Sequence, residues 1–219
     1  MANPSETTLR RSRLYSEELG IDLAANTDAE LFKWLLASVL LGAHISETIA
    51  RHTYRAFEHH RLLTPRRILA AGWDYLVNPV MREGGYVRYD EKTSTKLLRV
   101  CDRLITEYGG SLKRLHARAV DSRDLEARLD RFHGVGPVTV NIFLRELRPR
   151  WPKADPEPLP RVKSLAHRFG IDLRRHRRQS MTFTRIEAGL MRRRHAPRPH
   201  RSQARIPRPR RLARSTRRD

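Results

Sequence analysis

The stretch that decides the fold is residues 125–147, which read LEARLDRFHGVGPVTVNIFLREL. Its first apolar residues are spaced four and three apart, which predicts that they share one face of a helix. The run Gly134-Val135-Gly136 ends that helix, because a glycine accepts a left-handed backbone and leaves room for a close neighbour. Pro137 is a favourable first residue for a second helix, since the N–H that proline lacks would have no partner there. Residues 122–148 are therefore predicted to form two helices joined by a tight glycine turn.

The start of the second helix has the properties of an anion site. Its first backbone N–H groups have no partner within the helix, and the positive end of the helix dipole points outward. A DNA phosphate would fit there and would position the protein without reading base sequence. An ordinary helical hairpin, in which the glycines only turn the chain, is the alternative. The candidate DNA-binding residues of the turn are Gly134, Val135, Gly136, Val138 and Thr139.

The charge of the chain favours a polyanionic partner. Its 219 residues carry 45 Lys and Arg against 24 Asp and Glu, a formal net charge of +21. The tail from His195 onward holds 9 of the arginines, four prolines and one acid, and is expected to be disordered. The rest of the chain keeps 36 cationic against 23 acidic side chains, so it is basic by itself.

Cysteine usage excludes several classes of site. Cys101 is the only cysteine, so we expect no disulfide within the chain, no iron–sulfur cluster, no other cofactor and no metal site. The N-terminus has no apolar signal core, and the apolar run 31–43 is too short to span a bilayer and contains Lys33. We therefore expect a monomer without membrane contact, located in the cytoplasm and associated with the nucleoid if the source is bacterial.

Helix caps and glycine stops predict an all-α chain, because no stretch alternates as a strand does. A capping box at Thr27 starts a helix that covers nearly all its faces with apolar residues and ends at Gly42. Ser122 is expected to cap the first helix of the hairpin. The other predicted helices are residues 46–60, 64–72, 73–81, 89–108, 160–169 and 182–194, with a short one within 13–23.

These elements predict four regions. Residues 1–26 form a partly disordered N-terminal segment, with disorder up to about residue 12, and residues 27–150 form a helical core that ends in the hairpin. Residues 151–194 supply a Pro-rich linker and C-terminal helices that complete a second lobe. Residues 195–219 are the disordered Arg- and Pro-rich tail.

Four stretches in order resemble the endonuclease III-like DNA glycosylases of the helix–hairpin–helix superfamily. The hairpin string L-x-x-F-H-G-V-G-P-V-T-V is similar to the family's G-V-G-x-x-T-A pattern. The other stretches are LFKWLLASVLLGAHISETIARHTYRAF (31–57), GGYVRYDEKTSTKLLRVC (84–101) and PLPRVKSLAHRFGI (158–171), and FTRIEAGLMRRR extends the likeness to about residue 194. The resemblance implies two helical lobes around a cleft that binds double-stranded DNA, and a role in base-excision repair.

The chain departs from this family at its catalytic positions. Leu159 stands where the family has its catalytic aspartate, and Val138 where bifunctional members have a lysine nucleophile, so a Schiff-base lyase reaction lacks its nucleophile. Asp155 and Glu157 precede Leu159 on the Pro-rich linker and are the candidate catalytic acids; solvated linker carboxylates are the alternative. The expected function is a monofunctional DNA N-glycosylase that removes damaged or mismatched bases.

Two other functions stay open. A catalytically silent module of the same fold would bind bent or damaged DNA without cutting the glycosidic bond. A basic protein that associates with RNA would explain the tail but not the hairpin around Gly134.

Further candidate DNA contacts lie outside the hairpin. The resemblance places His44 at the family's wedge position after the first core helix, where it would insert into the duplex. A loop histidine near a helix end is the alternative. Arg88, Lys92 and Lys96 lie at four-residue steps on the predicted long helix and indicate either a basic stripe for phosphates or a solvated face. Tyr86, Tyr89 and Trp73 are aromatic candidates for stacking on a base, or core residues.

Overall fold

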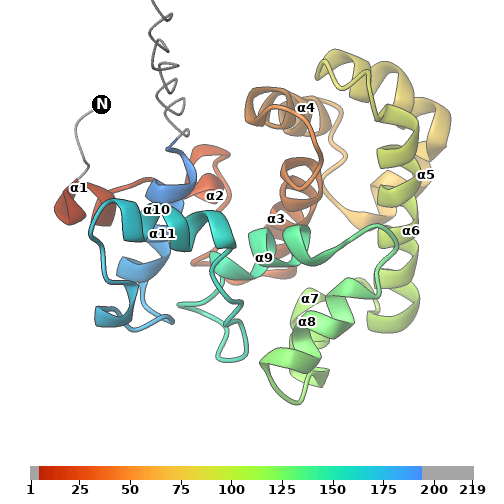
Figure 1. Ribbon diagram of the computed structural model, residues 1–219. Helices are drawn as coiled ribbons and strands as arrows, with labels where there is room; N and C mark the ends of the chain where they lie inside the picture. Colours follow the sequence, from red (N-terminus) through yellow and green to blue (C-terminus); the bar gives the residue numbers. More distant parts are fainter. Residues whose placement is uncertain (1–4, 194–219) are drawn as a thin grey trace, which may run out of the picture.

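The computed structural model describes residues 5–193 and is helical throughout that part, with no strand (Figure 1). The expected all-α class is therefore confirmed. The predicted disordered tail, residues 195–219, lies outside the described residues. Among residues 5–193, none of the helices combines the length and the apolar character that crossing a bilayer requires.

The helices follow one another along the chain with short connections. The first six elements are α1 (Glu6–Arg10), α2 (Tyr15–Glu18), α3 (Asp28–Leu41), α4 (Glu47–His59), α5 (Pro65–Tyr75) and the π-helical η1 (Leu76–Met81). They are followed by α6 (Asp90–Tyr108), α7 (Leu112–Arg118), α8 (Ser122–Asp130), α9 (Pro137–Arg145), α10 (Pro160–Arg168), the 3-10 turn η2 (Leu173–Arg175) and α11 (Met181–Met191).

Three of the predicted helix caps form in the structure. The hydroxyls of Thr27, Ser46 and Thr64 each accept a backbone N–H three residues further on, at 3.2–3.3 Å. At Thr27 only half of the capping box forms, because the carboxylate of Glu30 accepts instead from the N–H of Asp22 at 2.9 Å. The local sequence therefore sets where these helices begin.

Two local features differ from the prediction. Asp121, not Ser122, caps the first hairpin helix, accepting the N–H of Asp124 at 2.8 Å. Helix α7 was not predicted, because its seven residues are too few to show a period. The predicted helix boundary at Gly72 is confirmed as a kink, because the backbone leaves the helical conformation there (φ 74°, ψ 173°) within the element α5.

Helix α3 is the centre of the larger hydrophobic cluster. Its side chains from Leu31 to Leu40 are almost all buried, and it packs on α4 and α9. A Cβ added at Gly42, the residue that ends α3, would lie 2.3 Å from the hydroxyl of Thr139 in α9. The absence of that Cβ lets the end of α3 lie directly against the start of the second hairpin helix.

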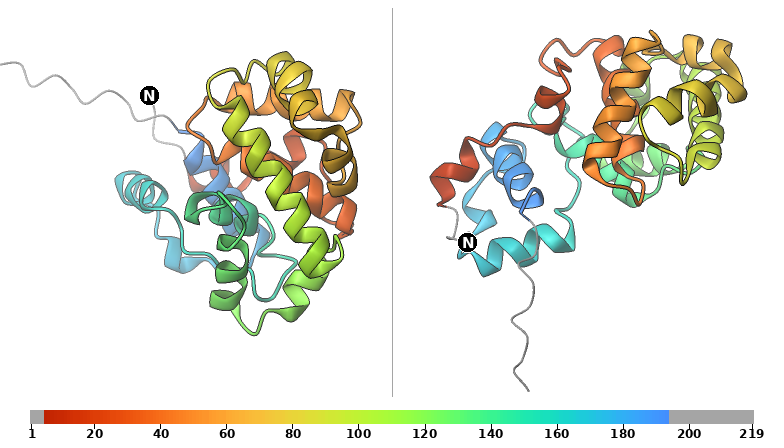
Figure 2. Two further views of the ribbon diagram at one scale, coloured as in Figure 1. Left: turned by 90° about the vertical axis from the view of Figure 1, so that its right-hand side faces the viewer. Right: turned by 90° about the horizontal axis from the view of Figure 1, so that it is seen from above.

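A smaller hydrophobic cluster joins α1 to α10 and α11. These helices lie together at one end of the molecule, away from α4, α5 and α6 (Figure 2). The buried side chains of this cluster are Leu9, Val162, Leu165, Ala166, Ile171, Ile186 and Leu190. Leu9 is 1% exposed, so the prediction of disorder up to residue 12 was wrong for residues 5–12. The prediction failed because α1 is stabilised by residues more than 150 positions away in the sequence, which its own five residues do not reveal.

Candidate nucleic-acid interface

A groove of about 910 Å³ runs beside the glycine turn, between the end of α3, the first half of α6 and the hairpin. We call it the hairpin groove. Its lining residues are Gly42, Ala43, His44, Trp73, Tyr89, Glu91, Lys92, Thr93, Thr95, Lys96, Arg99, His133, Gly134, Gly136, Pro137, Val138 and Thr139. The groove thus brings together most of the residues that the sequence proposes for DNA binding, from segments 90 positions apart.

The turn of the hairpin leaves the first N–H groups of α9 free. Gly134 takes a left-handed backbone with φ 72°, which a side chain would strain. Gly136 is the N-cap of α9 and provides no side-chain cap, and a Cβ built there meets no atom within 4 Å. Among residues 5–193 no acceptor is bonded to the N–H of Val138 or of Thr139. An anion could therefore approach the positive end of α9 through open space.

Two residues predicted at this site are buried. Val135 is 2% exposed, and its side chain belongs to the larger core cluster. Thr139 is 4% exposed and packs against Gly42. They hold the turn in place, whereas Val138 presents a side chain that is 50% exposed.

The cationic side chains of the groove come mainly from α6. Lys92 is exposed and Lys96 is half-buried, and both line the groove. Burial lowers the pKa of Lys96 below its ordinary value of 10.5. Arg99 continues the row one turn further on, and its Nη1 lies 3.2 Å from both ring nitrogens of His133. Sequence reasoning missed Arg99, although its spacing from Lys96 places it on the same helix face.

Arg88 is not part of this row. Helix α6 begins at Asp90, so Arg88 precedes it, and the prediction that Arg88 lies on the long helix was wrong. Its guanidinium lies over the ring of Tyr89 at 5.4 Å from the ring centre, and it does not line the groove. The four-residue spacing was misleading because the N-cap at Tyr89 turns the chain away from the helix axis.

Two aromatic side chains line the groove, and a third lies in the core. Trp73 is 39% exposed and donates its Nε1–H to the hydroxyl of Thr95 at 3.1 Å. Tyr89 is half-buried beside it in the groove lining. Tyr86 is 1% exposed and bonded to Thr93 at 3.0 Å, so it is a core residue. His44 is exposed and lines the groove where α3 ends.

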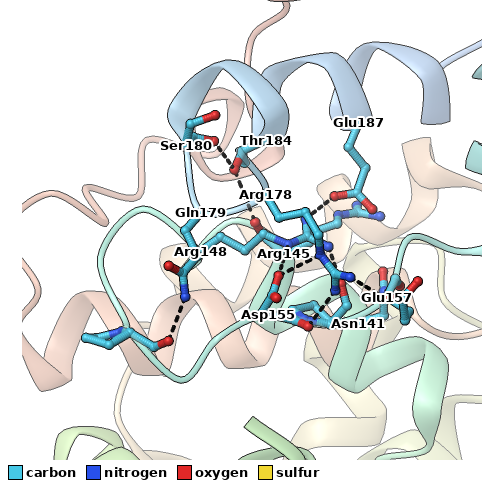
Figure 3. A network of polar contacts seen from close by, with 12 residues as sticks. Asn141, Arg145, Arg148, Asp155, Glu157, Arg178, Gln179, Ser180, Thr184 and Glu187 are labelled. Atoms are coloured by element: carbon cyan, nitrogen blue, oxygen red, sulfur yellow. Dashed lines mark hydrogen bonds and ion pairs between the residues drawn. The ribbon is translucent and has the colours of Figure 1, made fainter. Parts of the chain in front are cut away.

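The candidate acids Asp155 and Glu157 do not line the hairpin groove. Arg178 donates its Nε–H to Asp155 at 2.8 Å and also pairs with Glu157, whose other oxygen accepts from Lys163 at 2.8 Å. These contacts, with Lys163 first and Arg178 second, lower the pKa of Glu157. Figure 3 shows both carboxylates within a network of guanidinium groups. As they stand in the structure, they are ion-pair partners of basic side chains.

That network is anchored by a buried ion pair. The side chains of Arg148 and Glu187 are both fully buried and bonded to each other, and Arg148 also donates to the carbonyl of Pro156 (Figure 3). Its Nε lies 3.7 Å from the carboxylate of Asp155. The pair thereby holds the Pro-rich linker, which connects α9 to α10, against α11.

A second groove of about 510 Å³ lies on the other side of Pro137, which lines both grooves. Leu159 lines this groove, whereas Val138 lines the hairpin groove. The two residues that the resemblance places at the aspartate and lysine positions therefore face different grooves. Glu126 of α8 faces the second groove, and burial raises its pKa. In the described part of the chain Glu126 has no hydrogen bond or ion pair. Sequence reasoning missed it, because it occupies an ordinary polar position of an amphipathic helix.

Comparison of the chain with protein-family models, with curated proteins and with solved structures found no match. An uncapped helix start lies beside Lys92, Lys96, Arg99 and His133 in one groove with two aromatic rings. This arrangement can hold a chain of phosphates and stack against a base.

Proposed function

We propose that this protein binds double-stranded DNA in the hairpin groove, as a helix–hairpin–helix protein of the endonuclease III-like type. The observation that supports this most is the uncapped start of α9 at Gly136, in one groove with the cationic side chains of α6. Backbone N–H groups and side-chain cations then contact successive phosphates. Among the groove residues Glu91 is the single carboxylate, so the field across the surface favours a polyanion.

A charge-matched pair of double variants tests the location. Lys92→Gln with Lys96→Gln should weaken duplex binding severalfold and lower the slope of log affinity against log salt, because each neutralised phosphate contact releases about one counterion. Lys113→Gln with Arg114→Gln on α7 removes the same charge from exposed residues outside the groove and should change both quantities far less. Fluorescence anisotropy with a labelled duplex measures both. Equal losses of duplex affinity in the two double variants would show that binding depends on the overall charge of the protein and not on the hairpin groove.

Base release is a second candidate function, favoured by Glu126. Cleavage of a glycosidic bond develops positive charge on the sugar, which a nearby anion stabilises. Among the candidate acids, Glu126 faces an open groove without an ion-pair partner. Burial raises the pKa of Glu126, which favours the protonated form that a general acid needs.

The experiment is an incubation with duplexes that carry uracil, alkylated, oxidised or mismatched bases. If base is released, Glu126→Gln should abolish the release and leave duplex affinity unchanged. The control is Asp130→Asn, because Asp130 lines the same groove and is exposed. Borohydride should trap no covalent adduct through position 138, since Val138 offers no amine. Absence of release from all duplexes by the unaltered protein would leave binding without cleavage as the function.

A further inference from the structure

Two histidines and a glutamate meet on the surface between α4 and the segment after η1. His59 and His60 end α4, and Glu83 lies two residues after η1. One carboxylate oxygen of Glu83 lies 2.9 Å from Nδ1 of His59, and the other lies 2.8 Å from Nε2 of His60. The three candidate ligand atoms lie within 4.8 Å of one another. The fold thus brings the candidate metal-ligating atoms of His60 and of Glu83, 23 positions further along the chain, into one cluster.

The orientation of His60 is fixed by a second contact. The hydroxyl of Tyr75, the last residue of α5, lies 2.8 Å from Nδ1 of His60. The ring of Tyr75 also stands edge-on to that of His60, at 5.4 Å between ring centres. In the tautomer whose Nδ1–H donates to this hydroxyl, Nε2 carries no proton and is available to coordinate a cation beside Glu83. Metal-binding histidines are commonly held in this way through the nitrogen that does not coordinate.

We propose that His59, His60 and Glu83 form a zinc site. Two imidazole nitrogens and one carboxylate are a ligand set that Zn²⁺ prefers, with the fourth tetrahedral position left to water. Mg²⁺ and Ca²⁺ are disfavoured, because they need more oxygen ligands than this cluster supplies. The side chains of His59 and Glu83 are 72% and 42% exposed, so an ion can enter from solvent, whereas His60 is only 14% exposed and anchors the site.

An ion at this site would link the two ends of the segment that contains α5 and η1. The chain between His60 and Glu83 contains α5 and η1, including the backbone break at Gly72 and the groove residue Trp73. Zinc would close this segment into a loop by linking its two ends. A ligand that binds the folded chain stabilises it by mass action. Zinc binding therefore stabilises the α5–η1 segment, which contributes Trp73 to the hairpin groove.

Calorimetric titration of the full chain with ZnCl₂ tests the proposal. We expect one ion per chain, a melting temperature that rises with zinc, and strong visible absorption when Co²⁺ replaces zinc in a tetrahedral site. His60→Ala and Glu83→Gln should each abolish these effects. Tyr75→Phe should weaken affinity by about 10- to 100-fold while keeping one ion per chain, as expected when an outer contact is lost.

The matched control is His52→Ala, because His52 is an exposed histidine of the same helix outside the cluster. It should bind zinc like the unaltered chain. Circular dichroism of each variant without zinc shows whether the helices are retained. The proposal is overturned if the unaltered chain binds no zinc at millimolar concentration, or if folded His60→Ala and Glu83→Gln variants bind it as tightly as the unaltered chain.

Discussion

The side chain of Lys96 lies so close to Gly134 that a Cβ on the glycine would stand 2.6 Å from Cε of the lysine. The glycine turn of the hairpin and the cationic row of α6 are thus packed against each other. The close approach explains why Lys96 is half-buried although it is charged, and it directs the lysine along the groove wall beside the start of α9. The free backbone N–H groups at the start of α9 and the ammonium group of Lys96 are therefore available at the same part of the hairpin groove.

Gly136→Asp should lower duplex affinity without harming the fold. Gly136 has the extended backbone of an N-cap (φ −90°, ψ −178°), and aspartate is among the best N-cap residues because its carboxylate accepts the free N–H groups of the first turn. The variant should melt no lower than the unaltered protein but bind duplex at least about tenfold more weakly, over ~1.4 kcal/mol. Gly136→Ala adds a methyl group in open space and should bind normally. Normal binding by Gly136→Asp would refute the phosphate contact.

Duplex affinity should depend on pH through Lys96. Burial lowers the pKa of Lys96 in the free protein, and a bound phosphate would raise it toward 10.5. Between these two pKa values binding takes up a proton, so affinity should fall as pH rises through that window. Below the lowered pKa, Lys96 is charged in both states and contributes no pH dependence.

The measurement is a series of anisotropy titrations at constant ionic strength, from neutral pH to about pH 10. Lys96→Arg is the control, because a guanidinium stays charged across this range. The variant should show a flatter pH profile than the unaltered protein. An identical slope in both proteins would assign the dependence to another group.

Removing one partner of the Arg148–Glu187 pair should destabilise the protein strongly. Both side chains are fully buried, so Glu187→Ala leaves the guanidinium of Arg148 in the interior without its directly bonded partner, and only the carboxylate of Asp155 at 3.7 Å remains. We expect a loss of about 3–5 kcal/mol in the free energy of unfolding, measured by urea denaturation. The double variant Arg148→Met, Glu187→Leu removes both charges and should be clearly more stable than Glu187→Ala. If the double variant were less stable than Glu187→Ala, the pair would stabilise the fold by more than the neutralisation of two buried charges.

Leu9→Ala should destabilise the smaller hydrophobic cluster. The leucine is 1% exposed among side chains of α10 and α11, and its truncation leaves a cavity in that cluster. The expected loss is about 2–5 kcal/mol in the free energy of unfolding. Thr7→Ala changes an exposed residue of the same helix and should be nearly neutral. Equal stability of the two variants in urea would show that α1 does not support the cluster.

The sequence by itself determined the elements whose signals are local. Helix caps and glycine turns act within a few residues of sequence. The starts of the three helices capped by Thr27, Ser46 and Thr64, and the turn at Gly134, could therefore be predicted from neighbouring residues. The apolar composition of residues 31–40 likewise predicted the buried central helix. Capping and periodicity depend on bonds between residues three or four apart, which the sequence displays directly.

Only the tertiary structure decided what these elements bring together. It joined Leu9 to helices at the other end of the chain, placed Asp155 and Glu157 in ion pairs, exposed Glu126 to a groove, and set Glu83 beside His60. None of these relationships has a signal at fixed spacing. They arise because burial of apolar surface is non-directional and selects neighbours by packing, not by their distance along the chain.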